Sequence, residues 1–428
     1  MKKIIIVILL LITAIVITPF FIGSNVESQF RAQIAKINSN PTYELTITDY
    51  KKGWFRSGAE LEMSLKMPQM ESFPKFKATQ DMQHGPILWQ VDGLGLGLMD
   101  SEIEFEIPQD LQDELKKVDG LEEKVLFITS RTAFDLATTT HIHLNEFTVK
   151  TDENEINTKP AQGQFSYNMQ GHIEGQLNWK GLSITQSGTK ALSLGEITIE
   201  TKQQLVNGEM FSPTAIFDGF FTFALSNLNF SGDTPAEAIE MQELQLKVTS
   251  DIKTELANIG IVANVKTLHA ISQTFEDLTY DISLENLDVV SLQKINQLVS
   301  DSQGGDPMAM AANVQSLLPQ LIEKGPLLKI NKIGVQTHAG EIDSNLTLGI
   351  NQDIYDANNP MTMMLAVDAD AKGFAPEAFF TGLGLGANIE QMVQQNFLVR
   401  DQEKLSFVFS FKSGQALLNG APMPLGGM

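Results

Sequence analysis

A short stretch at residues 51–56 combines the residue types that bind anionic lipid headgroups. Lys51, Lys52 and Arg56 surround the indole of Trp54, in a chain whose formal net charge is −22. Basic side chains attract lipid phosphates, and tryptophan prefers the membrane–water interface. The pattern predicts a lipid or headgroup contact made by these four residues. The alternative is a β-bend whose aromatic side chains close the end of a sheet, while the basic side chains face solvent or pair with acids.

Three other patterns have some features of chemical sites. His141 and His143 lie on one side of an expected strand, a geometry that can hold a metal, but no third ligand stands nearby with the same parity. The letters of a dinucleotide fingerprint at 382–387 lie outside any βαβ pattern. His84 could act as a general base, but no nucleophile motif accompanies it. We therefore predict no catalytic residue, no metal site and no cofactor.

Composition narrows the class of partner. The net charge of −22 opposes binding to nucleic acid through long-range repulsion, so no nucleic-acid partner is expected. The chain has no cysteine, which excludes disulfides, thiolate chemistry and zinc–thiolate sites. Its 428 residues are enough to bury a large core.

The N-terminal residues predict export and anchoring. Lys2 and Lys3 precede an uncharged, almost wholly apolar run from Ile4 to Ile22. As a helix this run would be about 29 Å long, close to the thickness of the hydrocarbon core of a bilayer. The positive-inside rule keeps the two lysines in the cytoplasm and places the rest of the chain outside. Residues 1–23 are predicted to be a transmembrane anchor or uncleaved signal, and cleavage near residues 23–25 is the alternative.

The remaining elements must position the basic stretch. Apolar residues at helical spacing predict a juxtamembrane amphipathic helix over 24–40. Beyond it the apolar period becomes two, which predicts a β-rich extracytoplasmic body over 41–428. Helical patches interrupt this body near 108–118, 290–324 and 375–400. The predicted fold class is mainly β (α+β), with long, curved, largely antiparallel sheets and a few inserted helices behind the N-terminal helix.

The basic stretch falls between the first two expected strands of the body. Gly53 is expected to turn the chain there with a positive φ angle. The sequence His84-Gly85-Pro86 predicts a rigid turn further on. Near the C-terminus, Asn419-Gly420 is a strong hairpin signal.

The same residues carry a resemblance to a known family. An N-terminal anchor and helix, then a D/N-Y-x-x-G-x-F-x-S core, an H-G-P turn some thirty residues later and a closing asparagine–glycine strand are similar to the YdgA-like family of bacterial envelope proteins. The matching residues are Tyr50, Gly53, Phe55, Ser57, His84, Gly85, Pro86, Asn419 and Gly420. The resemblance implies a single-pass protein of the bacterial inner membrane with its bulk in the periplasm, and structural roles for these residues. The architecture also resembles AsmA-like proteins, whose curved sheets hold lipids in an apolar groove.

Two functions from different classes follow as expectations. In the first, a non-enzymatic envelope protein binds or hands over a lipid in an apolar β groove. In the second, the body is a packed scaffold that acts through an envelope protein partner. An uncharacterised hydrolase is a third alternative. An open apolar trough would favour the first, and a filled interior would favour the second.

Overall fold

The structure is a computed structural model of the 428-residue chain. It describes residues 43–65, 75–91, 93–106, 125–150, 154–186, 189–210, 214–232, 237–301, 319–356 and 361–423, with short pieces between 18 and 38 and single residues at 212, 234, 317 and 359. Most of the predicted anchor over 1–23 lies outside these residues. Among the helices that the structure describes, none is long and apolar enough to cross a bilayer.

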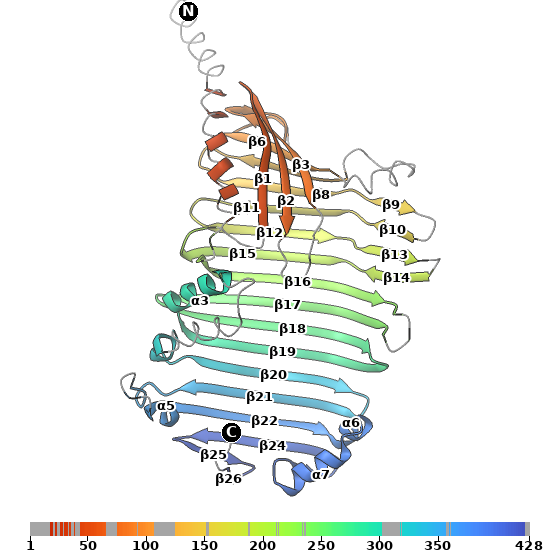
Figure 1. Cartoon of the computed structure of the whole chain (residues 1–428), viewed down its shortest axis with the longest axis vertical. Coiled ribbons are helices and arrows are strands. Elements are labelled where there is room, and N and C mark those ends of the chain that lie inside the picture. Colours follow the sequence, from red (N-terminus) through yellow and green to blue (C-terminus); the bar gives the residue numbers. More distant parts are fainter. Residues whose placement is uncertain are drawn as a thin grey trace, which may run out of the picture. The chain divides into compact units, whose positions relative to one another are not determined.

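The chain is mainly β, as predicted, and its sheets are antiparallel (Figure 1). The expected body over 41–428 divides into two compact units. Unit 1 comprises residues 1–190, 198–216 and 296–307, and unit 2 comprises residues 191–197, 217–295 and 308–428. Within the described residues, the chain passes between the units inside regular strands and a helix.

Unit 1 is built from antiparallel strands, of which some pair with the next strand in sequence and others pair across intervening strands. Its main order is β1 (Tyr43–Lys52), β2 (Arg56–Leu65), β3 (Phe76–His84), β6 (Met99–Phe105), β7 (Leu126–Thr132), β8 (Thr138–Leu144), β11 (Ala161–Tyr167), β12 (His172–Trp179) and β15 (Ile197–Asn207). A second group pairs β9 (Phe147–Lys150), β10 (Asn154–Thr158) and β13 (Leu182–Gln186). Two short strands, β4 (Ile87–Leu88) and β5 (Gly95–Leu96), pair within the loop that follows β3.

Unit 2 is a meander of long strands in nearly strict chain order. The order is β14 (Thr189–Leu194), β16 (Ile216–Phe230), β17 (Ile239–Lys253), β18 (Leu256–Ala270), β19 (Gln273–Asp288), β20 (Leu327–Thr337), β21 (Gly340–Ile350), β22 (Val367–Pro376), β24 (Lys404–Lys412), β25 (Gln415–Leu418) and β26 (Ala421–Met423). The short β23 (Val399–Asp401) also pairs with β24.

Helices occur in two of the three predicted insertions. The helix α3 (Val289–Asp301) begins where the Asp288 carboxylate accepts bonds from the backbone N–H and the hydroxyl of Ser291, which is the chemistry of an N-cap. Further helices are α5 (Met361–Ala366), α6 (Glu377–Gly382) and α7 (Gly386–Gln394), and residues 319–323 are also helical. The insertion expected near 108–118 lies outside the described residues. Within the expected helix over 24–40, the described residues between 26 and 35 are helical.

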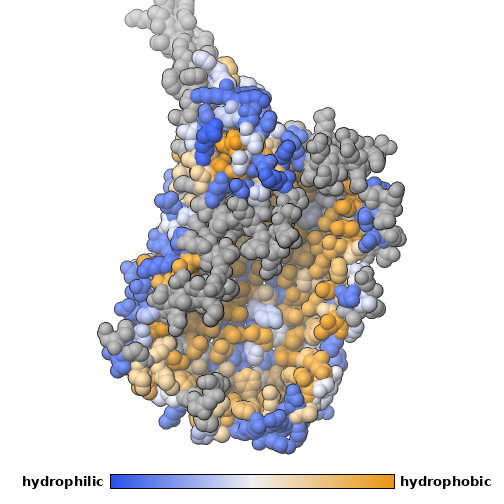
Figure 2. All heavy atoms as spheres, in the orientation of Figure 1, coloured by the Kyte–Doolittle hydropathy of each residue, from blue (hydrophilic) through white to orange (hydrophobic). Residues whose placement is uncertain are grey.

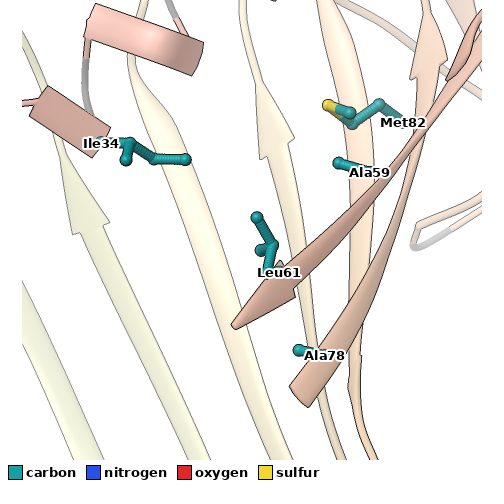
Figure 3. Packing of buried hydrophobic residues seen from close by; sticks show 5 residues of the cluster. All are labelled: Ile34, Ala59, Leu61, Ala78 and Met82. Atoms are coloured by element: carbon teal, nitrogen blue, oxygen red, sulfur yellow. The ribbon is translucent and has the colours of Figure 1, made fainter. Parts of the chain in front are cut away.

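The core of unit 1 lies between this N-terminal helical segment and the first strands. Its buried members are Ile34, Ala59, Leu61, Ala78 and Met82, and Figure 3 shows Ile34 on the helical segment to one side of the four residues from β2 and β3. Register places Leu61 opposite Ala78, so their side chains share one face. The apolar face of the helical segment and the apolar face of the strands therefore pack together in a single layer.

Candidate functional site

The structure brings the predicted basic stretch to the turn between β1 and β2. Lys51 pairs with Asp49 at 3.0 Å, and Arg56 pairs with Asp81 at 3.0 Å. Both pairs are exposed to solvent, so their contribution to stability is small. Trp54 and Lys52 lie in the same turn, and the indole is about half exposed. The headgroup contact stays a prediction, and Lys51 and Arg56 already have carboxylate partners.

The reason for glycine at position 53 differs from the predicted one. Gly53 does not have a positive φ angle, so that expectation is wrong. Instead, a Cβ atom at Gly53 would lie 2.3 Å from the carbonyl oxygen of Arg56. Because that oxygen belongs to the backbone, no side-chain movement could relieve the contact. The turn requires glycine for space and not for conformation.

The His84-Gly85-Pro86 turn packs against the turn between β1 and β2. The backbone N–H of His84 donates to the carbonyl of Phe55 at 2.8 Å, and the His84 ring lies with Nδ1 3.3 Å from the carbonyl oxygen of Trp54. The ring is buried, and it also meets the N-terminal segment: a Cβ atom at Gly23 would lie 2.3 Å from its Cε1. The peptide bond between Gly85 and Pro86 is cis. His84 therefore joins three separate pieces of the chain.

The other family-motif residues pack around the same core. Tyr50 lies 6.3 Å from Phe30, measured between ring centroids, and the Arg31 guanidinium lies 5.5 Å from the Tyr50 ring. Ser57 is buried opposite Met82 in the register of β2 and β3. These contacts give Tyr50 and Ser57 positions in the packing of unit 1.

Burial of His84 makes a prediction about acid stability. Loss of water lowers the pKa of the His84 imidazole below its usual value near 6.5. A lowered folded-state pKa means that the unfolded chain binds this proton more readily, so the stabilisation is complete above about pH 6.5 and falls as pH decreases toward the folded-state pKa. In urea unfolding at several pH values, the midpoint should fall more steeply between pH 6.5 and 5 for the parent than for His84→Asn. Equal slopes would contradict a neutral, buried imidazole.

A buried ion pair that sequence reasoning missed holds the loop after Pro86. The Asp100 carboxylate accepts from the Arg131 guanidinium through Nε and Nη2, each at 2.8 Å. Asp100 has no exposed surface, and the Arg131 side chain is 22% exposed. The same carboxylate accepts backbone N–H groups of Gln90 and Val91 at 3.1 and 3.0 Å.

Gln83 and Arg131 complete this polar anchor of the loop. The Gln83 side-chain oxygen accepts from the backbone N–H groups of Trp89 and Gln90, both at 3.1 Å. Arg131 donates to the carbonyl of Val91 and, at 2.8 Å, to that of Gly93. Nearly all of these partners are backbone atoms or one another, so the arrangement fixes the loop. The role that its geometry supports is structural.

The remaining motifs of the sequence occupy unremarkable settings. Asn419 and Gly420 both have positive φ angles at the turn between β25 and β26, and the Asn419 side chain accepts from the Val408 N–H at 2.8 Å. The His143 ring stacks on Phe127 at 4.8 Å. In the described part of the chain, no group of three or more histidine or acidic side chains could hold a metal. Residues 382–387 connect α6 and α7 rather than a strand and a helix.

The most extended chemical feature is an apolar row across unit 2. Residues that face each other in antiparallel strands have side chains on the same face, so the register traces the row directly. It comprises Phe221, Val248, Ile261, Ile282, Ile330, Leu346, Ala371, Phe409 and Leu418, on nine successive strands from β16 to β25. At about 4.8 Å between strands the row is about 40 Å long.

The opposite face of the same sheet is polar. A neighbouring row runs through Thr249, Gly260, Ser283, Lys329, Thr347, Asp370 and Ser410. Polar residues on one face normally mean that the other face is covered. Within the described residues, however, no member of the apolar row is buried, and Ile261 remains 37% exposed. Figure 2 shows hydrophobic side chains gathered over the strands of unit 2, with hydrophilic ones at the rim.

Comparison with known proteins gives one relationship. The family described as "Bacterial protein of unknown function (DUF945)" matches residues 1–426. No curated protein matches the chain. No solved structure matches it either. Since the match covers nearly the whole sequence, the chain belongs to the bacterial family of unknown function DUF945.

Proposed function

We propose that this chain is a YdgA-like, non-enzymatic envelope protein that binds lipid acyl chains along the apolar row of unit 2. It is held in the bacterial inner membrane by its N-terminal segment, with both units in the periplasm. The observation that carries the proposal is the apolar row, whose nine described residues all stay partly open to water. The apolar run from Ile4 to Ile22 supports the location.

The dimensions and chemistry of the row favour a hydrocarbon chain as the occupant. One leaflet contributes about half of the roughly 30 Å hydrocarbon core, so a row of about 40 Å is long enough for an extended acyl chain. Each methylene moved from water to an apolar surface gains about 0.8 kcal/mol. The row itself carries no charge and no hydroxyl, so recognition along it depends on apolar contact and length rather than on headgroup chemistry.

Site-specific photocrosslinking in cells tests this proposal on the full chain. A p-benzoylphenylalanine at position 280 replaces Tyr280, which is 47% exposed and lies beside the row, opposite Ala263 and Ile333. The matched control places the same group at Lys247, an exposed residue on the polar face of β17. We expect lipid-mass adducts from position 280 and none from position 247. Equal labelling, or protein adducts alone at position 280, would reject lipid binding, and the second result would favour the scaffold.

Substitutions at two neighbouring residues test how much lipid binding depends on the apolar row. Ile261 belongs to the row, whereas Val262 lies next to it on β18 and faces Lys247 and Asp281. An amide placed in an apolar contact costs about 1–3 kcal/mol when it finds no partner, and 1.4 kcal/mol is a tenfold change in binding. Ile261→Gln should therefore lower the lipid adduct at position 280 about tenfold. Val262→Gln should leave it within about twofold.

A further inference from the structure

Exposed apolar side chains in unit 1 gather at one end of its strands, along the border of the sheet that the turns form. All nine large hydrophobic residues of unit 1 that are exposed in the described chain lie in or beside four turns, at 53–55, 85–98, 133–137 and 168–171, and the end of β15 at 205–208, which together we call the tip edge. They are Trp54, Phe55, Trp89, Leu94, Leu96, Phe134, Leu136, Met169 and Val206. Their exposed fractions run from 45% for Val206 to 81% for Leu94. Single exposed apolar residues are ordinary, but a cluster of this kind marks an interaction surface.

Hydrogen bonds between successive turns show that the tip edge is continuous. The first turn bonds to His84, and the Gly85 N–H donates to the carbonyl of Leu98 at 2.7 Å. Leu98 in turn donates to Thr132, at the start of the turn between β7 and β8. At the far end, Leu205 donates to Gly171 at 2.8 Å. The turns therefore form one continuous border of the sheet, and they are not a set of scattered positions.

The turns of this edge are depleted in charge. Within these ranges only Asp92 and Asp135 are charged, although 19% of the whole chain is charged; Lys52 and Arg56 flank the first range. The Asp135 carboxylate is already bonded to the backbone N–H of Ala137 at 3.1 Å. Solvent-facing turns normally carry polar residues, so the depletion indicates a surface that is not simply solvated.

Leu136 strengthens the argument, because the fold does not require a leucine there. Its φ angle is 67°, in the left-handed region that favours glycine or asparagine, and its side chain is about half exposed. Neither conformation nor packing within the described chain explains this residue. Leu136 therefore adds one outward-facing apolar side chain to the tip edge.

The N-terminal segment identifies that environment. The apolar run ends at Ile22, and the next residue, Gly23, lies against the ring of His84 at the tip edge. We infer that the tip edge rests on the surface of the bilayer that holds residues 4–22, with Trp54 and Trp89 at the headgroup level and the leucine tips below it. This inference rests on the proposed anchoring, and it is independent of lipid binding in unit 2.

The three tryptophans of the chain provide a direct test. Trp54 and Trp89 lie at the tip edge, whereas Trp179 ends β12 at the other side of the sheet, where its indole N–H donates to the carbonyl of Lys159. Seven residues of strand separate Trp179 from the tip edge, which is about 23 Å. Full-length variants that each retain one tryptophan, with phenylalanine at the other two positions, are reconstituted into vesicles containing phosphatidylcholine brominated on its acyl chains.

We expect brominated lipid to quench about half or more of the Trp54 and Trp89 emission and to leave Trp179 nearly unchanged, as for side chains at and away from the interface. Reconstituted protein in which Trp54 and Trp89 are unquenched, or in which all three are quenched alike, would overturn the inference alone. A chain that does not enter vesicles would overturn both the anchoring and the inference.

An identical pentapeptide supplies the matched control. The sequence GLGLG occurs at 93–97 in the tip edge and at 382–386 in unit 2, and all four of its leucines are exposed. Leu94→Ser with Leu96→Ser should reduce quenching of Trp89 about twofold or more, because the tips that enter the bilayer are lost. Leu383→Ser with Leu385→Ser should not change it. Equal effects of the two pairs would count against membrane contact at the tip edge.

Discussion

Asp100→Ala is expected to destabilise unit 1 by about 3–5 kcal/mol, because it leaves the Arg131 guanidinium without its partner in a partly buried site. The substitution also removes the acceptor for the N–H groups of Gln90 and Val91. Intrinsic fluorescence during urea unfolding of the full chain measures this loss, since all three tryptophans belong to unit 1. With a urea dependence of about 1–3 kcal/mol per molar, the midpoint should fall by about 1 M or more.

The control is a second arginine–aspartate pair in the same unit. Asp81→Ala removes the partner of Arg56, but both side chains are about half exposed, and the expected loss is about 0–1 kcal/mol. The two variants delete the same group and differ chiefly in burial. A loss for Asp100→Ala no larger than that for Asp81→Ala would show that the loop is held by other contacts.

Gly85→Ala is expected to destabilise unit 1 by about 2–3 kcal/mol through overpacking. A Cβ atom at this position would lie 1.8 Å from the carbonyl oxygen of Gly97 and 3.1 Å from that of Leu98. Both obstacles are backbone atoms, so the loop between β3 and β6 would have to move. This explains the glycine of the H-G-P turn by close approach of two chain segments.

Gly58→Ala is the matched control for this substitution. Gly58 lies in β2 of the same unit, its φ angle is not positive, and the nearest atom to an added Cβ would be 3.9 Å away. Alanine there should be neutral or stabilise by up to about 1 kcal/mol, because it restricts the unfolded chain. The same fluorescence-detected urea unfolding compares the two. Equal midpoints for the two variants would mean that the loop yields at Gly97 without cost.

Period-two patterns predicted strands well where one face of the sheet is apolar and the other is polar. In β6, Ile103 and Phe105 alternate with Glu102 and Glu104 and pack against the core of unit 1. Asp100 shows the limit of that reasoning. It has the same parity as Glu102 and Glu104, so the pattern places all three on one wet face. The loop over residues 85–98 covers only the end of this face, and the covering follows from tertiary contacts that no local pattern records.

Gly53 and the apolar row illustrate two other limits. A glycine between strands suggests a positive φ, but close approach to Arg56 demands the same residue, and sequence alone does not separate these causes. The individual strands of the row could be predicted from alternation. Their alignment into one continuous line depends on the register of eight strand pairs, which is set by turns and bulges throughout unit 2.

The meander of unit 2 has a consequence for how this sheet folds and evolves. From β16 to β22 each strand bonds to the strand that follows it, so most contacts are local in sequence. Such an array behaves as a nearly one-dimensional system, in which stability is a sum over adjacent strands and folding can propagate from any established hairpin. Gain or loss of one hairpin would change the length of the sheet by about 10 Å and leave the other strand pairs intact. Relatives with a different number of hairpins would have longer or shorter apolar rows, with the same kind of apolar side chain on each strand.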